Sequence, residues 1–589
     1  EPAVVELTSY LEPVLAPQSA DVAHPAFSNL FVRTELVSQY DSIIASRRPR
    51  ETGKSSLWMV HTITVEGETA GSLQYETIRG NFIGRGRDVT NPEGLTQPLT
   101  NTVGIVLDPI MCLRRRVRVE PGRIVKVSFM TGLADSRDEA VTLAAKYHNP
   151  HSIDRAFDLA LTRSRVETTY LNLRAGEIKT YQNMISQIVY LSPVRKKHRD
   201  IIAKNSKGQS GLWPYGISGD LPIVLVSIDE TEHAELVREC LKAHEYWRLK
   251  GLPVDLVILN RDQSKYLQPL KELVNEIVLS SSGRDVIDKP GGVHVLDASI
   301  MPEEDITLVH AAARIILRGG AGPIDLQLKQ PDQEDYPGEK SFNRYEMKYE
   351  ARDYPMDLSF FNGYGGFAKD GREYIIKLKG NSHTPAPWIN VISNGGFGFL
   401  VSENGSGSVW AENSRENKLT PWSNDPVTDP PGEVVYLRDE ENGDVWSITP
   451  LPIRDNGDYT VRHGFGYTVF QHTSHGIDHS LTVFVPEEEP VKVSLIRLKN
   501  YSNKKRNLSI TYYIRPVMGI SEQLTQQHIH TAYDERNKAL FIKNPFNYDF
   551  PGRTAFIAVS GEISSYTGDR TEFLGIGGNL ANPKALSRE

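Results

Sequence analysis

The sequence is poor in cysteine: Cys112 and Cys240 are the only two among 589 residues. Two distant cysteines cannot build the disulfide framework of a small secreted domain. Neither one has a second cysteine or a histidine at the spacing of a zinc site. We therefore expect no metal and no cofactor, and the low cysteine content agrees with a reducing compartment.

Long apolar runs and excess positive charge are also missing. No stretch approaches the ~18–20 apolar residues of a membrane-spanning helix, and the opening residues EPAVVELTSY do not have the pattern of a signal peptide. The formal net charge of −8 gives no general attraction to nucleic acid or to an anionic membrane. We expect no nucleic-acid partner and no direct membrane insertion, and we interpret LRRRVRV (113–119) as a solvated strand face.

The residue pattern of the sequence changes several times along the chain. The length of the chain predicts about three or four domains. Residues 1–135 are rich in β-branched and aromatic residues, as in SLWMVHTITVEG, which predicts β structure. At Ser136 and Glu139 a capping box opens an Ala-rich segment, so we assign 136–215 to a helical segment.

Residues 216–320 alternate short apolar runs with helical stretches, which is typical of a parallel sheet with crossover helices. We predict a small α/β unit with three parallel strands, and a last helix over EDITLVHAAARIIL (304–317). The ends of these strands carry no glycine-rich phosphate loop, which argues against a nucleotide site.

Residues 321–357 are polar and poor in aliphatics, and we interpret them as a linker. From 358 to 589 alternating apolar residues and a hairpin turn at Asn442-Gly443 predict a large β-sandwich. The predicted fold class is therefore multidomain, with large antiparallel β-sandwiches flanking a helical segment and a small α/β unit.

A repeat suggests that the sandwich is duplicated. FIGRGRDVTNPEGL (82–95) and FLGIGGNLANPKAL (573–586) are identical at six of fourteen positions, and LTSYLEPVL (7–15) resembles ITYYIRPVM (510–518) in the same order. On this interpretation residues 1–135 are the C-terminal part of a first copy, and 358–589 are a second, nearly complete copy. Chance similarity of β-rich segments is the alternative. We expect the chain to be an excerpt of a longer protein.

Aromatic and polar side chains gather in three long turn-rich stretches of the second copy. A pyranose has apolar faces and a polar equator, so carbohydrate recognition needs flat aromatic surfaces beside hydrogen-bonding groups. The alternative is structural, with tryptophans that hold the loops and an arginine that pairs with a carboxylate. The six candidates for substrate binding are Trp388, Arg415, Asn417, Trp422, Asp425 and His463.

The motif GLWPYGISGDLP (211–222) offers a weaker catalytic candidate, Asp220, beside Trp213 and Tyr215. A carboxylate near aromatic side chains could act in a sugar cleft. In the alternative that we favour, Asp220 satisfies backbone N–H groups where the chain turns into the first parallel strand.

Four motifs of the second copy follow one another in order. They are FFNGYGGFAKDGREYII (360–376), TPAPWIN (384–390), LTPWSNDPVTDPPGEVVYLRD (419–439) and RHGFGYT (462–468). These motifs resemble the N-terminal β-sandwich of glycoside hydrolase family 94, the cellobiose, chitobiose and related β-glucan phosphorylases. Together with GLWPYGISGDLPIVLVSID, they are similar to the C-terminal part of the bacterial cyclic β-1,2-glucan synthases.

The resemblance implies a glycosyltransferase or phosphorylase activity on β-1,2-glucan or gluco-oligosaccharides, with inorganic phosphate as a possible co-substrate. In that family an aspartic acid in a later (α/α)6 barrel, within an Asp-Trp-Asn-Asp-like motif, protonates the glycosidic oxygen. No Asp-Trp pair occurs in this sequence, so the catalytic acid is expected outside it. The expected partners are missing upstream and downstream domains of one polypeptide, located at the cytoplasmic face of an inner-membrane protein.

Overall fold

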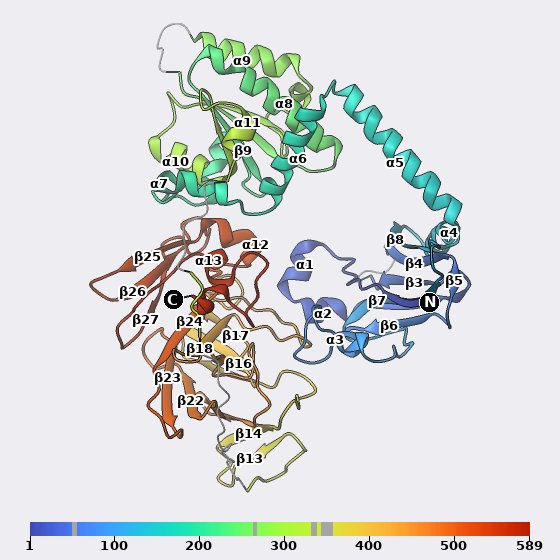
Figure 1. The fold of residues 1–589 in the computed structure, drawn as a ribbon. Coiled ribbons are helices and arrows are strands. Elements are labelled where there is room, and N and C mark those ends of the chain that lie inside the picture. The colour runs from blue at the N-terminus through green and yellow to red at the C-terminus, as the bar shows by residue number, and fades with distance from the viewer. Residues whose placement is uncertain (50–55, 263–267, 331–337, 343–356, 589) are drawn as a thin grey trace. The chain divides into compact units, whose positions relative to one another are not determined.

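The computed structural model describes residues 1–49, 56–262, 268–330, 338–342 and 357–588 (Figure 1). The chain forms two compact units, each built from separate stretches of sequence. The first unit contains residues 1–160, 339–515 and 569–589, and the second contains 161–338 and 516–568. No helix of the described residues is long and apolar enough to cross a membrane.

Two antiparallel sheets form the N-terminal part of the first unit. Ile43 and Ile63 of one sheet share an apolar core with Met111 and Leu113 of the other, so the sheets pack face to face. One sheet consists of β1 (Ala3–Thr8), β5 (Glu68–Thr69), β6 (Gln74–Ile78) and β7 (Pro109–Val119). The other consists of β2 (Val32–Val37), β3 (Ser42–Arg47), β4 (Trp58–Glu66) and β8 (Lys126–Ala134).

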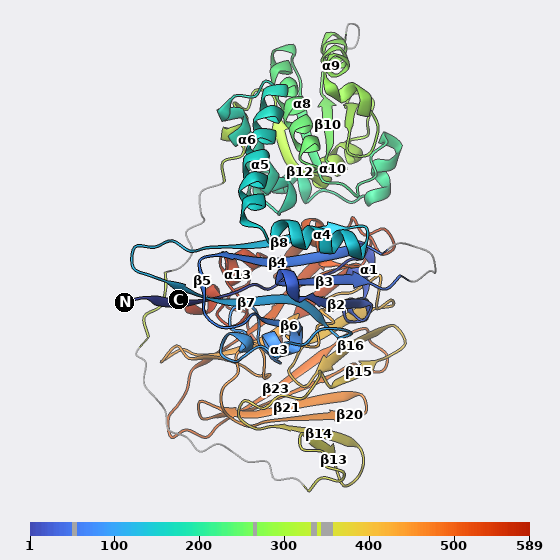
Figure 2. The same cartoon turned by 90° about the vertical axis from the view of Figure 1, so that its right-hand side faces the viewer.

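The helical segment predicted from Ser136 onward is confirmed. It contains α4 (Arg137–Tyr147), α5 (Pro150–Tyr170) and α6 (Ala175–Val189). The Ser136 side chain accepts from the backbone N–H of Glu139, as predicted for the cap. Ala140 and Ala144 of α4 pack on Trp58 and Val60, and Figure 2 shows α4 lying along β4 and β8.

The remainder of the first unit is antiparallel β structure, which confirms the predicted sandwich architecture. The three sheets share one core that contains Leu378, Phe399, Leu437 and Phe470. The predicted hairpin is confirmed as β18–β19, with Asn442-Gly443 in its turn.

The strands of these sheets are as follows. The six-stranded sheet has, in spatial order, β13 (Gly365–Phe367), β14 (Glu373–Leu378), β20 (Tyr459–Gly464), β21 (Tyr467–Ser474), β22 (Ile477–Phe484) and β23 (Val493–Asn500). The other two are β15 (Ile389–Ser393), β16 (Phe397–Ser402) and β17 (Gly407–Ala411), and β19 (Val445–Ser447), β18 (Glu433–Asp439) and β24 (Leu508–Ile514).

The two sequence repeats adopt the same local structure. Each begins with a short helix, α3 (Arg79–Ile83) or α13 (Arg570–Leu574), followed by a glycine in a left-handed backbone conformation. The φ angles of these glycines, Gly84 and Gly575, are 86° and 89°. Each repeat then passes into a 3-10 turn, at Glu93–Leu95 and at Lys584–Ser587.

The aromatic packing of the repeats is also the same. Tyr10 stacks on Phe82 with ring centroids 5.2 Å apart, and the equivalent Tyr513 stacks on Phe573 at 5.1 Å. Chance similarity would not reproduce a backbone conformation and a ring contact that involves residues far apart in sequence. We therefore interpret the repeat as a duplication.

The second unit contains a four-stranded parallel sheet in the order β11-β10-β9-β12. Its strands are β9 (Ile223–Ile228), β10 (Asp255–Asn260), β11 (Val293–Asp297) and β12 (Ala313–Arg318). Val224 and Val226 face a core shared with α6, α8 (Ala234–Leu249) and α9 (Pro269–Ser280). Ile223 and Leu225 face α10 (Glu303–Ala312), as the period-2 alternation of a strand requires.

The prediction of three strands was therefore wrong. The last predicted helix, 304–317, ends at Ala312, and the following residues form β12, which pairs with β9 in parallel. The run Ile315–Leu317 is apolar and contains two β-branched isoleucines, which favour a strand. Burial beside β9 stabilises this strand, although an Ala-rich helix precedes it.

Residues 516–568 lie in the second unit. The prediction that all of 358–589 belongs to the second sandwich was therefore wrong for this segment. They contain α12 (Glu522–Thr525) and the meander β25 (His530–Asp534), β26 (Ala539–Lys543) and β27 (Thr554–Ala558). Phe546, between β26 and β27, packs against the core formed by the parallel sheet and α10. Of the predicted linker, 331–337 and 343–356 lie outside the described residues, and α11 (Ile324–Gln327) forms before them.

The left-handed glycine of the second repeat provides a test of this local structure. A Cβ at Gly575 would lie 3.1 Å from the Cβ of Lys584, and its φ of 89° disfavours L side chains. We expect Gly575→Ala to lower the free energy of unfolding of the first unit by about 1–3 kcal/mol. Urea denaturation measures the change.

Gly395→Ala is the matched control, because its added Cβ would meet nothing within 4 Å and its φ is not left-handed. We expect an effect within about 0.5 kcal/mol for this control. Equal stability of the two variants would show that the repeat does not require its glycine.

Candidate functional site

Four of the six binding candidates lie on one loop, residues 412–429, which follows β17. The side chain of Asn413 accepts from the backbone N–H groups of Arg415 and Glu416 at 2.9 and 3.0 Å, so the loop begins with an Asx turn. Near its end, Asn424 and Asp429 both have a φ of 47°. A loop with this backbone needs contacts that hold it in place.

Arg79 of the first repeat supplies the strongest of these contacts. Its Nη1 and Nη2 atoms donate to the two carboxylate oxygens of Asp425 at 2.8 and 2.7 Å, a bidentate pair. Nη1 also donates to Asp108 at 3.0 Å. The Asp425 carboxylate further accepts from the Thr428 hydroxyl and from the backbone N–H of Val427.

The pKa values of the two carboxyl groups that share Arg79 are shifted in opposite directions. Burial raises the pKa of Asp108, and the charge of Arg79 does not overcome that effect. Burial also acts to raise the pKa of Asp425, but Arg79 and Thr428 outweigh it and lower this pKa to about 2. Asp425 is therefore the more acidic of the two carboxyl groups, and it is fixed to the first repeat.

A second arginine, Arg85, anchors the far end of the loop. Its Nη2 atom donates to Glu403 at 2.9 Å and to Asp429 at 3.2 Å. Glu403 is fully buried, and burial raises its pKa despite the nearby guanidinium. Its carboxylate also accepts from the Thr384 hydroxyl and, at 2.8 Å, from the backbone N–H of Trp388.

Sequence reasoning did not identify Arg79, Arg85 or Glu403. The one available signal was that Arg79 and Arg570 are identical at equivalent positions, three residues before the start of the quoted repeat. Val427 packs with Phe82 and Ile83 of the first repeat, so apolar contact accompanies the ion pairs.

The loop presents its candidates in different ways. The Arg415 side chain is 75% exposed, and its Nε atom lies 3.3 Å from Oε1 of Glu416. Asn417 is buried and donates to the Ala411 carbonyl at 3.0 Å, while its Oδ1 has no hydrogen-bond partner among the described residues. Trp422 is half-buried, with the His24 ring edge-on at 5.0 Å.

The remaining two candidates, Trp388 and His463, lie together on the sandwich. His463 has Nε2 3.1 Å from the Trp388 carbonyl and Nδ1 3.0 Å from the Thr468 hydroxyl. Burial lowers the pKa of His463 to about 4, so the ring is neutral at pH 7. The half-buried Trp388 ring is edge-on to Tyr364 and Tyr374.

The structure thus connects the two groups of candidates through Glu403. This carboxylate contacts the Trp388 backbone on one side and, through Arg85, reaches Asp429 at the end of the loop. The arrangement contains no acid and base facing one open cavity among the described residues.

Asp220 lies on the second unit, as an exposed residue on the turn before β9. Its carboxylate accepts from Gln209 at 2.9 Å, and its own N–H donates to the Ser218 hydroxyl at 3.1 Å. The exposure of Asp220 and its place in the turn favour the structural interpretation, although its carboxylate accepts from a side-chain amide and not from the predicted backbone N–H groups. The nearby Tyr215 hydroxyl donates to Asp305 at 2.8 Å.

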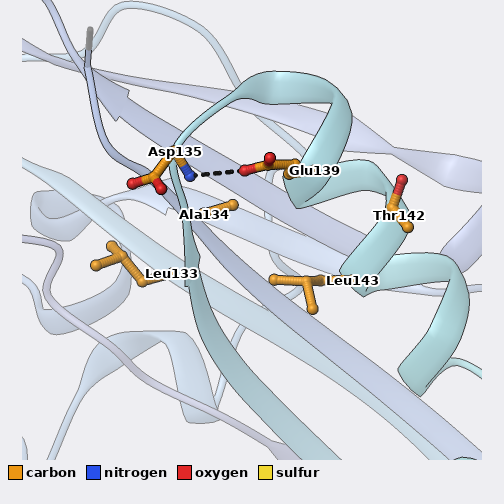
Figure 3. A pocket seen from close by; sticks show the side chains of 6 residues that line it. All are labelled: Leu133, Ala134, Asp135, Glu139, Thr142 and Leu143. Atoms are coloured by element: carbon orange, nitrogen blue, oxygen red, sulfur yellow. Dashed lines mark hydrogen bonds between the residues drawn. The ribbon is translucent and has the colours of Figure 1, made fainter.

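Two hollows occur elsewhere in the first unit. One, of about 320 Å³, is lined by Leu133, Ala134, Asp135, Glu139, Thr142 and Leu143 at the start of α4 (Figure 3). The other, of about 220 Å³, is lined by Glu6, Ala70, Gly71, Ser72, Gln74, Arg114 and Arg116. Neither lining includes a candidate residue. Within the described ranges no cluster of His, Cys, Asp and Glu is placed to hold a metal ion.

Known proteins similar to this chain act on glycosides. Residues 1–150 and 372–589 match the family model of the glycosyl hydrolase 94 supersandwich domain. Over 599 aligned residues and 99% of its length, the chain is 35% identical to cyclic beta-(1,2)-glucan synthase NdvB of Rhizobium meliloti, of which it covers 21%.

Shorter matches cover less of the chain. It is 31% identical to N,N'-diacetylchitobiose phosphorylase of Vibrio proteolyticus over 233 residues, 38% of this chain and 29% of that protein. It is 30% identical to 3-O-beta-D-glucopyranosyl-beta-D-glucuronide phosphorylase of Paenibacillus borealis over 150 residues, 25% of this chain and 18% of that protein. The chain therefore spans less than a third of the length of each of these relatives.

The pair of Arg79 and Asp425 gives a pH-dependent prediction. Because the pKa of Asp425 lies below the ordinary aspartate value, its stabilisation is complete above about pH 4 and is lost as the pH falls toward 2. We expect Asp425→Asn to lower the free energy of unfolding of the first unit by about 2 kcal/mol at pH 7. The difference in free energy of unfolding between Asp425→Asn and the unchanged protein should become smaller as the pH falls from 4 to 2.

Urea denaturation across this pH range measures both effects. Asp370→Asn, at an exposed turn residue, is the control and should behave like the unchanged protein. A difference between Asp425→Asn and the unchanged protein that stayed constant down to pH 2 would contradict the ionised pair.

Proposed function

Because the chain belongs to the glycosyl hydrolase 94 supersandwich family, we propose that it is the glucan-contacting, supporting part of a protein that builds cyclic β-1,2-glucan. The observation that carries the proposal is the joining of the two matched segments. Arg79 and Arg85 of the first segment hold Asp425 and Asp429, at the C-terminal end of the 412–429 loop of the second. The 35% identity over 99% of the chain supports β-1,2-glucan as the substrate class.

In this proposal the six candidates divide into two roles. Arg415, which is exposed, donates to sugar hydroxyls, while the indoles of Trp388 and Trp422 offer apolar faces. The other three act as positioning residues, because each already has a hydrogen-bond partner within the protein. Asp425 is bonded to Arg79, Asn417 to the Ala411 carbonyl and His463 to the Trp388 carbonyl.

We place the chemistry in a further domain of the same polypeptide, an (α/α)6 barrel in which phosphate attacks the glucoside with inversion. The relative's greater length supports this, since the chain covers 21% of it. Inorganic phosphate would then be a co-substrate of that domain, and the full protein would sit at the cytoplasmic face of an inner membrane.

A purely architectural role is the second candidate function. The half-burial of Trp388 and Trp422 favours it, because indoles that pack against His24, Tyr364 and Tyr374 stabilise loops whether or not a sugar binds. The ion pair of Arg415 with Glu416 also fits the architectural role, whereas the 75% exposure of the Arg415 side chain leaves it accessible to a sugar, so this residue tests the two roles. Asp220, a turn residue, carries no third proposal.

The experiment is phosphorolysis of linear β-1,2-gluco-oligosaccharides by the longer polypeptide, followed as glucose 1-phosphate release. We expect Arg415→Ala to raise the KM for the oligosaccharide about tenfold, because a charge-assisted hydrogen bond is lost. The kcat should change little. The 589-residue chain alone should release no glucose 1-phosphate.

Arg123→Ala, at another exposed arginine of the first unit, is the matched control and should leave both constants unchanged. An unchanged KM for Arg415→Ala would favour the architectural role. Glucose 1-phosphate release by the chain alone would refute our placement of the catalytic acid.

A further inference from the structure

Two large aromatic side chains lie exposed and side by side on the second unit. Trp213 belongs to the 3-10 turn Gln209–Tyr215, and Tyr548 lies between β26 and β27. Their ring centroids are 5.8 Å apart with an angle of 30° between planes. Trp213 is 52% exposed and Tyr548 is 63% exposed. Such a pair at a surface is unusual, because large aromatic side chains gain stability from burial.

The segment that carries Trp213 is firmly anchored. Leu212, its neighbour, is fully buried in the core formed by the parallel sheet and α10. The indole N–H donates to the Ser218 carbonyl at 3.3 Å. The polar atom of the indole is therefore satisfied within the protein, and the ring keeps one orientation.

The segment that carries Tyr548 is anchored equally well. Asn547 donates to the Met518 carbonyl at 3.0 Å and accepts from the backbone N–H groups of Asp549 and Phe550. Phe546 stacks on His528 with centroids 3.8 Å apart and packs on the same core as Leu212. Both rings are thus preorganised by buried neighbours.

The two segments meet through their backbones at Gly208. A Cβ built there would lie 3.5 Å from the Pro545 carbonyl and 3.7 Å from the Asn547 carbonyl. Exposed carboxylates lie close in sequence to the two rings: Asp220, which accepts from Gln209, and Asp549, which follows Tyr548. The result is a fixed pair of stacked, exposed rings.

We propose that Trp213 and Tyr548 form a platform that binds a gluco-oligosaccharide, by stacking of pyranose faces on the two rings. The apolar faces of a pyranose match the rings, and its equatorial hydroxyls match the carboxylates and amides around them. Linear β-1,2-linked glucan is the named ligand, and this choice rests on the proposed function. The platform is distinct from the 412–429 loop, which belongs to the first unit.

The test is calorimetric titration of the 589-residue chain with linear β-1,2-gluco-oligosaccharides. We expect Trp213→Ala and Tyr548→Ala each to weaken binding about tenfold, as for the central residues of a binding surface. Trp213→Phe should retain part of the affinity because it keeps a flat ring. Melting temperatures of the variants, measured in parallel, show whether each remains folded.

Phe465→Ala is the matched control, since this aromatic side chain is 85% exposed on the hairpin of β20 and β21 in the first unit. It should bind like the unchanged chain. Unaltered affinity in folded Trp213→Ala and Tyr548→Ala variants would overturn the platform, as would absence of binding by the unchanged chain. The first result would leave the proposed function standing, because the Arg415→Ala phosphorolysis measurement judges that function separately.

Discussion

The ion pair of Arg79 and Asp425 is the constraint on which the candidate site depends. The 412–429 loop has left-handed residues at Asn424 and Asp429, so its backbone does not select this conformation unaided. Arg79 binds both oxygens of Asp425 at 12% and 19% side-chain exposure, where water screens the charges only partly. Removing either partner would leave a poorly solvated charge, which is why such a pair fixes geometry more surely than it adds stability.

The repeat, which we interpret as a duplication, explains how this constraint is built. Each copy forms a short helix, a left-handed glycine and a ring stack, so the repeated segment is a rigid local structure in both places. In the first copy that rigid segment also presents Arg85 to Glu403 and Asp429. The equivalent residue of the second copy is Ile576, which cannot form these ion pairs. One copy thus supports the loop of the other, while the two share their scaffold.

Much of this local structure could be predicted from the sequence, because it follows from short-range rules. The cap at Ser136, the hairpin at Asn442-Gly443 and the repeated glycines specify their conformations within a few residues. The second bond of the predicted capping box differs, because Glu139 accepts from the backbone N–H of Asp135. Two features could not be predicted this way. The strand β12 depends on burial beside β9, although an Ala-rich helix precedes it. The partner of Arg79 lies 346 residues away, and no local pattern identifies it.

The same distinction explains why some residues of the candidate site can be identified from the sequence and others cannot. An exposed donor such as Arg415 is recognisable by residue type and loop composition, because its role depends on its own side chain. A positioning residue such as Glu403 contributes through Thr384, Trp388 and Arg85, and its role exists only once these groups surround it. In this chain, sequence patterns therefore identify exposed polar side chains such as Arg415, whereas the buried charges that shape the surface around them require the fold.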